Sequence, residues 1–89
     1  MQVENLPGLG PKSAKWLNEI NIFTREDLIT SAPVTIMVRL ERAGITPGLN
    51  MLYALVGAIE GIHWQEVARK RKAELVLALD AARELEKLE

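Results

Sequence analysis

The 89 residues carry 12 acidic and 11 basic side chains, so the formal net charge is −1. Apolar residues make up 48% of the chain and charged residues 26%, which is typical of one folded domain over residues 1–89 and excludes a disordered segment. No run approaches the ~18 apolar residues of a membrane helix and no signal-peptide pattern opens the chain, so we expect a cytoplasmic protein without a membrane partner. The absence of cysteine excludes disulfides, thiolate catalysis and cysteine-ligated zinc.

The first expected element is a glycine turn that leads directly into a helix. Residues 5–17 read Asn-Leu-Pro-Gly-Leu-Gly-Pro-Lys-Ser-Ala-Lys-Trp-Leu. The two glycines permit a sharp turn, and Pro11 fits the first turn of a helix, where its missing N–H costs nothing. Unpaired N–H groups and the positive end of the helix dipole therefore face outward and favour an anion. The predicted site residues are Gly8, Leu9, Gly10, Lys12, Ser13 and Lys15.

Two other phosphate-binding loops do not fit this segment. A dinucleotide-binding loop needs a strand before it, and only residues 1–5 precede this one. A P-loop needs a Gly-Lys-Ser/Thr ending, but here Pro11 separates Gly10 from Lys12. The spacing hydrophobic-x-Gly-hydrophobic-Gly-x-x-x-Ala-x-x-hydrophobic instead resembles the helix-hairpin-helix motif. That resemblance implies contact with the DNA phosphate backbone without reading of the base sequence.

The charge balance weakens the DNA interpretation, although the local arrangement of charges can still support it. Residues 1–23 hold two lysines against Glu4 and Glu19, whereas a dedicated nucleic-acid binder usually has a basic excess. Both lysines lie near the helix start, and Glu19 lies about two turns further along. Two interpretations of Lys12, Ser13 and Lys15 stay open: phosphate contact, or a solvated helix start, which is slightly favoured.

The remaining apolar positions recur at spacings of three and four, which predicts helices and no strand. The first helix should run from about Pro11 to Glu19 or Ile20 and stop at Asn21, which tolerates a left-handed conformation. Its inward residues should be Ala14, Leu17 and Ile20. Trp16 should pack against a neighbouring helix, which we favour over an exposed anchor for a protein partner.

A second helix should run from Arg25 to about Ser31. Thr24 and Asp27 have the spacing of a capped N-terminus. Ile22 or Phe23 should join this turn to the core, and the buried residues of the helix should be Leu28 and Ile29.

The third helix should begin at Pro33 and end at Gly44. The fourth should run from Leu49 to about Glu60 and be central, because its apolar residues, together with Ile62, leave little for solvent. Gly57 and Gly61 lie four apart in the sequence and should allow a neighbouring helix to come close.

The fifth helix should begin at about Val67 or Arg69 and run to the end of the chain. Its predicted core seam is Leu75, Ala78 or Leu79, Ala82 and Leu85. The basic run at residues 69–72 is either a binding surface or, as we favour, a solvated helix face. His63 has no partners for a metal site, so it should cap or pack the turn before this helix and take no part in catalysis.

The chain as a whole resembles the C-terminal domain of the TfoX/Sxy family, bacterial regulators associated with natural competence. The resemblance covers about residues 6–79. It rests on an ordered series of matches: Leu9-Gly-Pro-Lys-Ser13, Trp16-Leu17, Ile22, Thr24, Asp27-Leu28, Arg39-Leu40, Ala43-Gly44, Leu49-Asn50, Leu52-Tyr-Ala-Leu55, Gly57-Ala58, Gly61 and His63-Trp64. It implies an all-α domain related to competence and transcription regulators.

We therefore expect a compact all-α bundle of about five helices with a helix-hairpin-helix-like (SAM-like) element at its N-terminus. The expected function is a noncatalytic binding module that contacts the DNA backbone through residues 8–13. The alternative is a domain that binds a protein partner or a second copy of itself without DNA. No cofactor, metal or small-molecule substrate is expected, because one histidine and no cysteine leave no coherent catalytic group.

Overall fold

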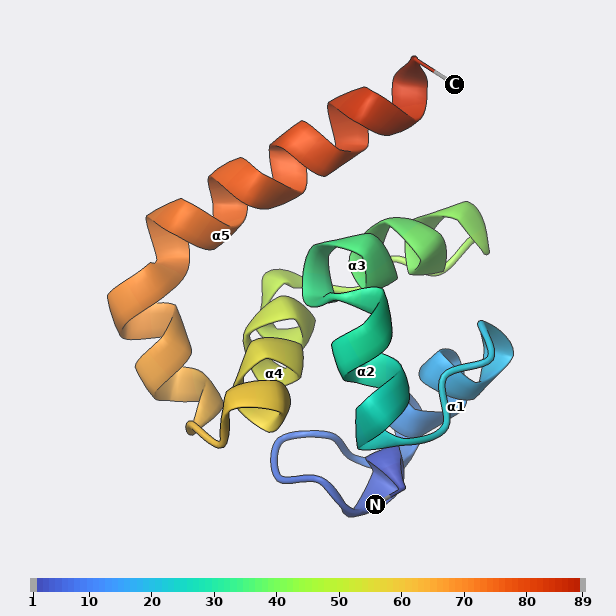
Figure 1. The fold of residues 1–89 in the computed structure, drawn as a ribbon, viewed down its shortest axis with the longest axis vertical. Helices are drawn as coiled ribbons and strands as arrows, with labels where there is room; N and C mark the ends of the chain where they lie inside the picture. Colours follow the sequence, from blue (N-terminus) through green and yellow to red (C-terminus); the bar gives the residue numbers. More distant parts are fainter. Residues whose placement is uncertain (1, 89) are drawn as a thin grey trace.

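A computed structural model describes residues 2–88, which form five α-helices after a short 3₁₀ turn (Figure 1). The elements are η1 (Val3–Asn5), α1 (Pro11–Glu19), α2 (Arg25–Ser31), α3 (Pro33–Arg42), α4 (Leu49–Glu60) and α5 (Trp64–Lys87). No strand runs through the described residues, and a single antiparallel bridge joins Gln2 to Thr24. The predicted all-α bundle is confirmed.

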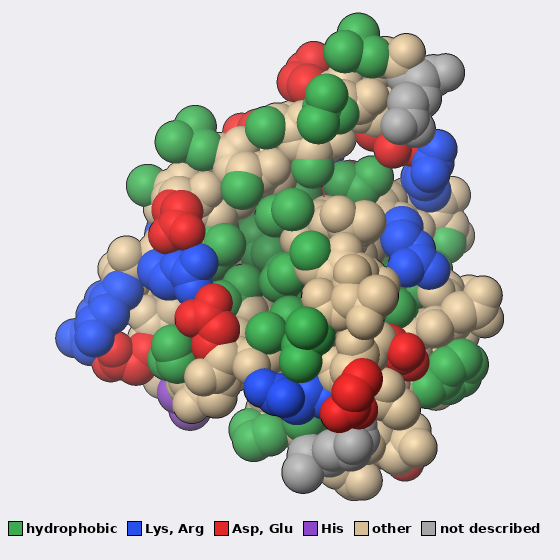
Figure 2. Space-filling view, viewed as in Figure 1, with side chains coloured by type: hydrophobic (Ala, Val, Ile, Leu, Met, Phe, Trp, Pro, Cys, Tyr) green, Lys and Arg blue, Asp and Glu red, His purple; other side chains and the backbone are tan. Residues whose placement is uncertain are grey.

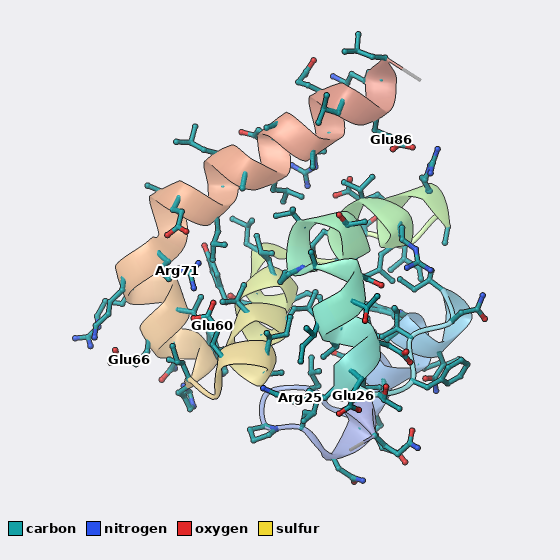
Figure 3. All side chains as sticks on the ribbon, in the orientation of Figure 1. Arg25, Glu26, Glu60, Glu66, Arg71 and Glu86 are labelled. Atoms are coloured by element: carbon teal, nitrogen blue, oxygen red, sulfur yellow. The ribbon has the colours of Figure 1, made fainter. Side chains whose placement is uncertain are left out.

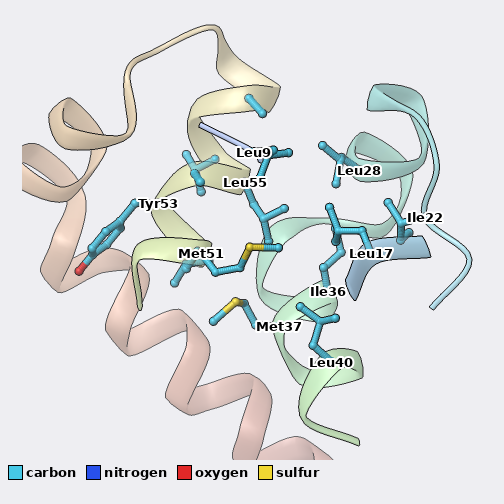
Figure 4. Packing of buried hydrophobic residues seen from close by; sticks show 14 of the residues in the cluster. Leu9, Leu17, Ile22, Leu28, Ile36, Met37, Leu40, Met51, Tyr53 and Leu55 are labelled. Atoms are coloured by element: carbon cyan, nitrogen blue, oxygen red, sulfur yellow. The ribbon is translucent and has the colours of Figure 1, made fainter. Parts of the chain in front are cut away.

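Helix α4 lies at the centre of the core. All eight residues from 51 to 58 are buried, as the apolar sequence of this helix predicts. Figure 4 shows Leu17 of α1, Leu28 of α2 and Met37 of α3 gathered on the same cluster as Leu55 of α4. Each such side chain contributes roughly 1.5–3 kcal/mol of hydrophobic stabilisation, so α4 is the element that holds the other helices in place.

Local signals fix the starts and stops of the first helices. Asn21 has a φ of 65° and ends α1 as predicted. The Asp27 N–H donates to Thr24 Oγ1 at 3.1 Å while the Thr24 N–H donates to Asp27 Oδ2 at 3.1 Å, which is a complete capping box. Ala32, between α2 and α3, also has a positive φ, of 72°. Nothing in its side chain favours that conformation, and the sequence did not indicate it.

Ile29 and Ile62, which were predicted to lie in the core, are exposed, and so is Phe23, one of the two candidates for the contact between the turn before α2 and the core. Ile29 is 49% exposed because α2 is one short helix that meets the core only along the side of Leu28. Phe23 is exposed, and Ile22 is the residue that joins this turn to the core. Ile62 is 40% exposed because it lies in the turn after α4 and not on a helix face.

Gly57 of α4 and Gly61, which follows this helix, both serve the turn between α4 and α5. Gly61 has a φ of 74° and caps α4, with its N–H donating to Gly57 O at 2.8 Å. A Cβ added to Gly57 would lie 2.3 Å from the carbonyl oxygen of Ile62. The prediction that both glycines admit a neighbouring helix was therefore wrong for Gly61, and at Gly57 the space is taken by the backbone returning toward α5.

Helix α5 begins earlier than predicted, at Trp64, because the Nδ1 atom of His63 accepts the Gln65 N–H at 3.1 Å and caps the helix there. Its predicted end at residue 89 lies outside the described residues. The helix bends at Arg71, where φ is −127° and ψ is 15°. Beyond the bend it runs alongside α3 (Figure 1).

The core seam of α5 is shorter than predicted. Leu75 and Leu79 are buried and Ala82 packs partly against the core. Ala78 is exposed, so Leu79 is the seam residue of that pair. Leu85 is 65% exposed, because past the bend this helix points its last apolar residue away from α3. The prediction for Leu85 was wrong.

Candidate functional site

Apolar anchors hold the predicted hairpin on the core. The side chains of Leu6, Leu9 and Ala14 are about 5% exposed or less. The Leu9 N–H donates to Leu6 O at 3.1 Å, and the Ala14 N–H donates to Gly10 O at 2.9 Å. Leu9, one of the six predicted site residues, therefore supports the hairpin from inside and presents no side chain to a ligand.

The two glycines of the hairpin differ in what they do. Gly8 has a φ of 85°, which only glycine adopts without strain, and it packs beside Ala54 of α4 and Trp64 of α5. Gly10 has a φ of −92° and precedes α1 as its N-cap, and a Cβ placed there would meet nothing within 4 Å. Gly8 shapes the turn, and Gly10 leaves its outer side open to a close approach.

Several backbone donors point out of this hairpin. The amides of Gly10, Lys12 and Ser13 have no acceptor among the described residues, and Gly10 offers no side chain to cap α1. These N–H groups carry the positive end of the helix dipole. The hairpin therefore offers an anion three donors in a fixed arrangement.

Lys12 and Lys15 near this turn are both exposed, and Lys12 makes a contact with an aromatic ring. The Nζ atom of Lys12 lies 5.1 Å from the centroid of the Trp16 ring, a cation–π contact. Trp16 is half-buried and packs at the edge of the core, as predicted. Its ring therefore holds the Lys12 side chain against the surface of α1. Lys15 is exposed one turn further along. Both charges lie on the helix whose N-terminus carries the free amides.

A second helix N-terminus opens on the same place. A cleft of about 350 Å³ lies between the hairpin and the start of α4, lined by Gly8, Ser13, Trp16, Gly48, Asn50, Met51 and Ala54. Gly48 is the N-cap of α4 and, like Gly10, supplies no capping side chain. Ser13 of α1 and Asn50 of α4 thus line the same cleft.

Sequence reasoning did not include Gly48 and Asn50 in the site. The only signal in the sequence was a glycine directly before a helix that has no side chain to cap it. That signal does not say which other helix end lies opposite.

The basic run at residues 69–72 is largely engaged in ion pairs. Figure 3 shows Arg71 directed toward Glu60, at 2.6 Å, and Arg71 also binds Glu74 at 3.0 Å. The hydrogen bonds that Arg71 donates to Glu74 and then to Glu60 raise the pKa of Arg71. Lys70 Nζ lies 3.1 Å from the Glu66 carboxylate, which Arg69 also contacts.

The pKa of Glu66 is lowered from its ordinary value of 4.5, first by the hydrogen bond from Lys70 and then by the charges of Arg69 and Lys70. Acidic neighbours on α4 and α5 thus balance the basic run. These pairs favour the solvated helix face over a binding patch.

His63 occupies the turn between α4 and α5 as a structural residue. Its ring stacks on Trp64 with centroids 5.9 Å apart and an angle of 26° between the planes, and it caps α5 as described above. The predicted capping role is confirmed. Within residues 2–88, no three side chains of the His, Asp or Glu type come close enough to hold a metal ion. None of the described helices is long and apolar enough to cross a membrane.

Comparison with known proteins gives one match. The family model described as the TfoX C-terminal domain matches residues 1–79, a range that contains the hairpin, all of α1 to α4 and the first two thirds of α5. No curated protein and no solved structure matches the chain.

Proposed function

This chain belongs to the family of TfoX C-terminal domains, and we propose that it is a noncatalytic module that binds the DNA phosphate backbone. The family suggests a domain related to competence and its regulators. The proposed contact is the hairpin at residues 8–13. The observation that supports it is the set of free amides at Gly10, Lys12 and Ser13, at the N-terminus of α1. Ser13 also lines the cleft that reaches the N-terminus of α4.

The chemistry of such a contact follows from the donors. A phosphate oxygen accepts N–H bonds from the first turn of α1, and Lys12 and Lys15 add charge. Gly10 leaves the backbone uncovered, so a phosphate can approach it. Backbone amides and lysines contact phosphate and not base edges, which makes the expected binding independent of DNA sequence.

A protein partner or a second copy of the chain is the second candidate function. The observation that favours it is the large exposure of leucines on α5, 70% at Leu77 and 65% at Leu85. Apolar residues this exposed, when they lie on one face of a helix, mark protein interaction surfaces.

The DNA proposal is tested by titrating a labelled duplex of arbitrary sequence at low and at moderate salt, with protein dilute enough to be monomeric. The test variant is Lys12→Ala with Lys15→Ala. The control is Lys72→Ala with Lys87→Ala, which removes the same charge from exposed lysines of α5. We expect salt-sensitive binding that weakens about tenfold or more in the test variant, with a log–log salt slope smaller by about two units.

Two outcomes would overturn the DNA proposal. One is the absence of binding at low salt. The other is an equal loss of affinity in the test and control variants, because that result would reflect total charge and not the hairpin.

A further inference from the structure

The turn of the hairpin at residues 7–8 rests against the ring of Trp64. A Cβ placed on Gly8 would lie 3.6 Å from the Cβ of Ala54 and 3.7 Å from the Cδ1 of Trp64, so both α4 and the first residue of α5 support this turn. Figure 1 shows the hairpin loop beside the connection from α4 to α5. Residues far along the chain therefore hold the turn in place.

This support consists of packing and not of hydrogen bonds. Within the described part of the chain, no hydrogen bond joins residues 6–13 to α4 or α5. Pro7 and Gly8 are exposed, and together with residues of the α4–α5 turn they line a cavity of about 240 Å³. The cavity leaves space into which the turn can move. Trp64 has the largest side chain on the wall of this cavity, so its ring does most to oppose that movement.

The turn between α4 and α5 holds Trp64 itself. The carbonyl oxygen of Gly57 accepts the N–H groups of Gly61 and Ile62 at 2.8 and 3.0 Å. The Nδ1 atom of His63 caps α5, and the ring of His63 stacks on the ring of Trp64. The Trp64 ring is half-buried and packs against the core. The hairpin therefore rests on a side chain whose own position is fixed.

The direction of the hairpin amides decides how well they bind a phosphate. A hydrogen bond prefers a donor angle above about 150° and weakens steeply below about 120°. The net charge of the chain is −1, and Figure 2 shows basic and acidic side chains close together on the face that it presents. Binding therefore depends on the aim of a few donors more than on total charge. The first of them, at Gly10, lies only two residues after Gly8.

We propose that Trp64 is a positioning residue for DNA binding. Its ring holds the turn at Gly8 so that the amides of Gly10, Lys12 and Ser13 point together at a phosphate group. This inference rests on the proposed DNA contact. The Trp64 side chain carries no charge, so its removal should misdirect the amides while leaving every lysine in place.

The position of the hairpin is tested first without DNA, by N–H residual dipolar couplings, which report the orientation of each amide bond. In Trp64→Ala, the couplings of Gly10, Lys12 and Ser13 should depart from those of the unmodified chain, while the couplings of α3 should not change. The control Leu79→Ala removes a buried side chain from the part of α5 that runs alongside α3. It should leave the three hairpin couplings as they are.

The same variants are then titrated with a labelled duplex of arbitrary sequence, at a temperature where circular dichroism shows each of them folded. Trp64→Ala should bind about tenfold more weakly, roughly the loss of one hydrogen bond to a charged group. The slope of log affinity against log salt should stay the same, because no cation is removed. Leu79→Ala should bind like the unmodified chain.

Two further variants separate the ring from packing in general. Trp64→Phe keeps an aromatic ring beside Gly8 and should restore most of the affinity. Trp64→Leu keeps an apolar side chain without a ring and should bind weakly, like the alanine variant. The leucine variant also provides the comparison if the alanine variant does not fold.

Three results would overturn the proposal. They are hairpin couplings that stay unchanged when the Trp64 ring is removed, a phenylalanine variant that binds no better than the leucine variant, and an equal loss of affinity in Leu79→Ala. If the unmodified chain binds no DNA at low salt, the proposed function fails and the role of Trp64 fails with it. If the unmodified chain binds DNA and the Trp64 variants bind equally well, only the role of Trp64 fails.

Discussion

The hairpin and the C-terminal part of α5 are both surface features, but they are built in opposite ways. In the hairpin, the apolar side chains of Leu6 and Leu9 point into the core and the backbone donors point outward. In α5 beyond Arg71, one side is buried at Leu75 and Leu79, while the other side exposes leucines. The exposed groups of the first are polar and suit an anion, and those of the second are apolar and suit a protein.

The two regions also differ in how they are held. The hairpin is fixed by buried anchors and by backbone hydrogen bonds at both of its ends. The end of α5 is held to α3 by ion pairs, Arg83 with Glu41 and Arg42 with Glu86. Burial is worth more than surface ion pairing. The hairpin should therefore resist change, and the end of α5 should tolerate it.

The largest expected contrast comes from one substitution made in both regions. Leu9→Ala should lower the free energy of unfolding by about 2–5 kcal/mol, because it leaves a cavity beneath the hairpin. Leu85→Ala should change it by less than about 0.5 kcal/mol, because this side chain is mostly in water. Urea unfolding of dilute protein measures both values. Equal losses would mean that the two leucines are not differently buried.

A second contrast lies within the hairpin. Gly8→Ser should lower the free energy of unfolding by about 1–2 kcal/mol, since its φ of 85° is strained for any L side chain. Gly10→Ser should leave stability unchanged or raise it by a few tenths of a kcal/mol, because serine is a good N-cap and the position is open. Thermal melts of the two variants give the comparison. A similar loss at both positions would contradict the assigned roles.

Breaking an ion pair between α5 and α3 should change the free energy of unfolding by a smaller amount. Glu41→Gln removes the partner of Arg83, which lies 2.6 Å away. We expect a loss of about 0.2–1 kcal/mol at low salt that shrinks as salt is added. The matched control is Glu84→Gln, which breaks the more exposed pair with Lys87 within α5 and should cost less. A larger loss for the control would show that α5 is not held by Glu41.

The smallest effect on stability is expected from a change of pH at the capping box of α2. The turn before this helix is joined to the segment before the hairpin, because the Val3 N–H donates to Phe23 O. Hydrogen bonds from the Phe23 and Thr24 amides lower the pKa of Asp27 below 3.8. Its folded pKa is thus below its unfolded value. The contribution of the Asp27 carboxylate to the free energy of unfolding is complete above its unfolded pKa and is lost as pH falls through its folded pKa.

Melting temperatures of the protein and of the Asp27→Asn variant between about pH 2 and pH 6 measure the stabilisation that the Asp27 carboxylate provides. The two curves should be separate above pH 4 and converge in stronger acid. A constant separation across the whole range would contradict the assignment.

Much of the fold could be predicted from single residues that act locally. Pro11 and Pro33 start helices, Asn21 ends one, and Thr24 with Asp27 caps another. The same is true of the hairpin, because the need for glycine at residue 8 follows from the chain's own turn. These features depend on a few neighbouring residues, and the sequence shows all of them.

The remaining features depend on residues far apart in the chain. The bend in α5 occurs where Arg71 binds Glu60 of α4. The guanidinium of Arg25 reaches the carbonyls of Ala58 and Ile59 at the end of α4. Spacing alone shows neither pairing. Leu85 was assigned to the core for the same reason, since periodicity shows that a helix has an apolar side but not whether the fold covers it.

The most direct test of the division between the two regions is a two-dimensional NMR titration of the dilute protein with a short DNA duplex, following the backbone amide signals. The account predicts that the largest shifts occur at Gly10, Lys12 and Ser13, with little change at Leu77 and Leu85. Shifts confined to α5, or no shifts in the hairpin at low salt, would contradict it.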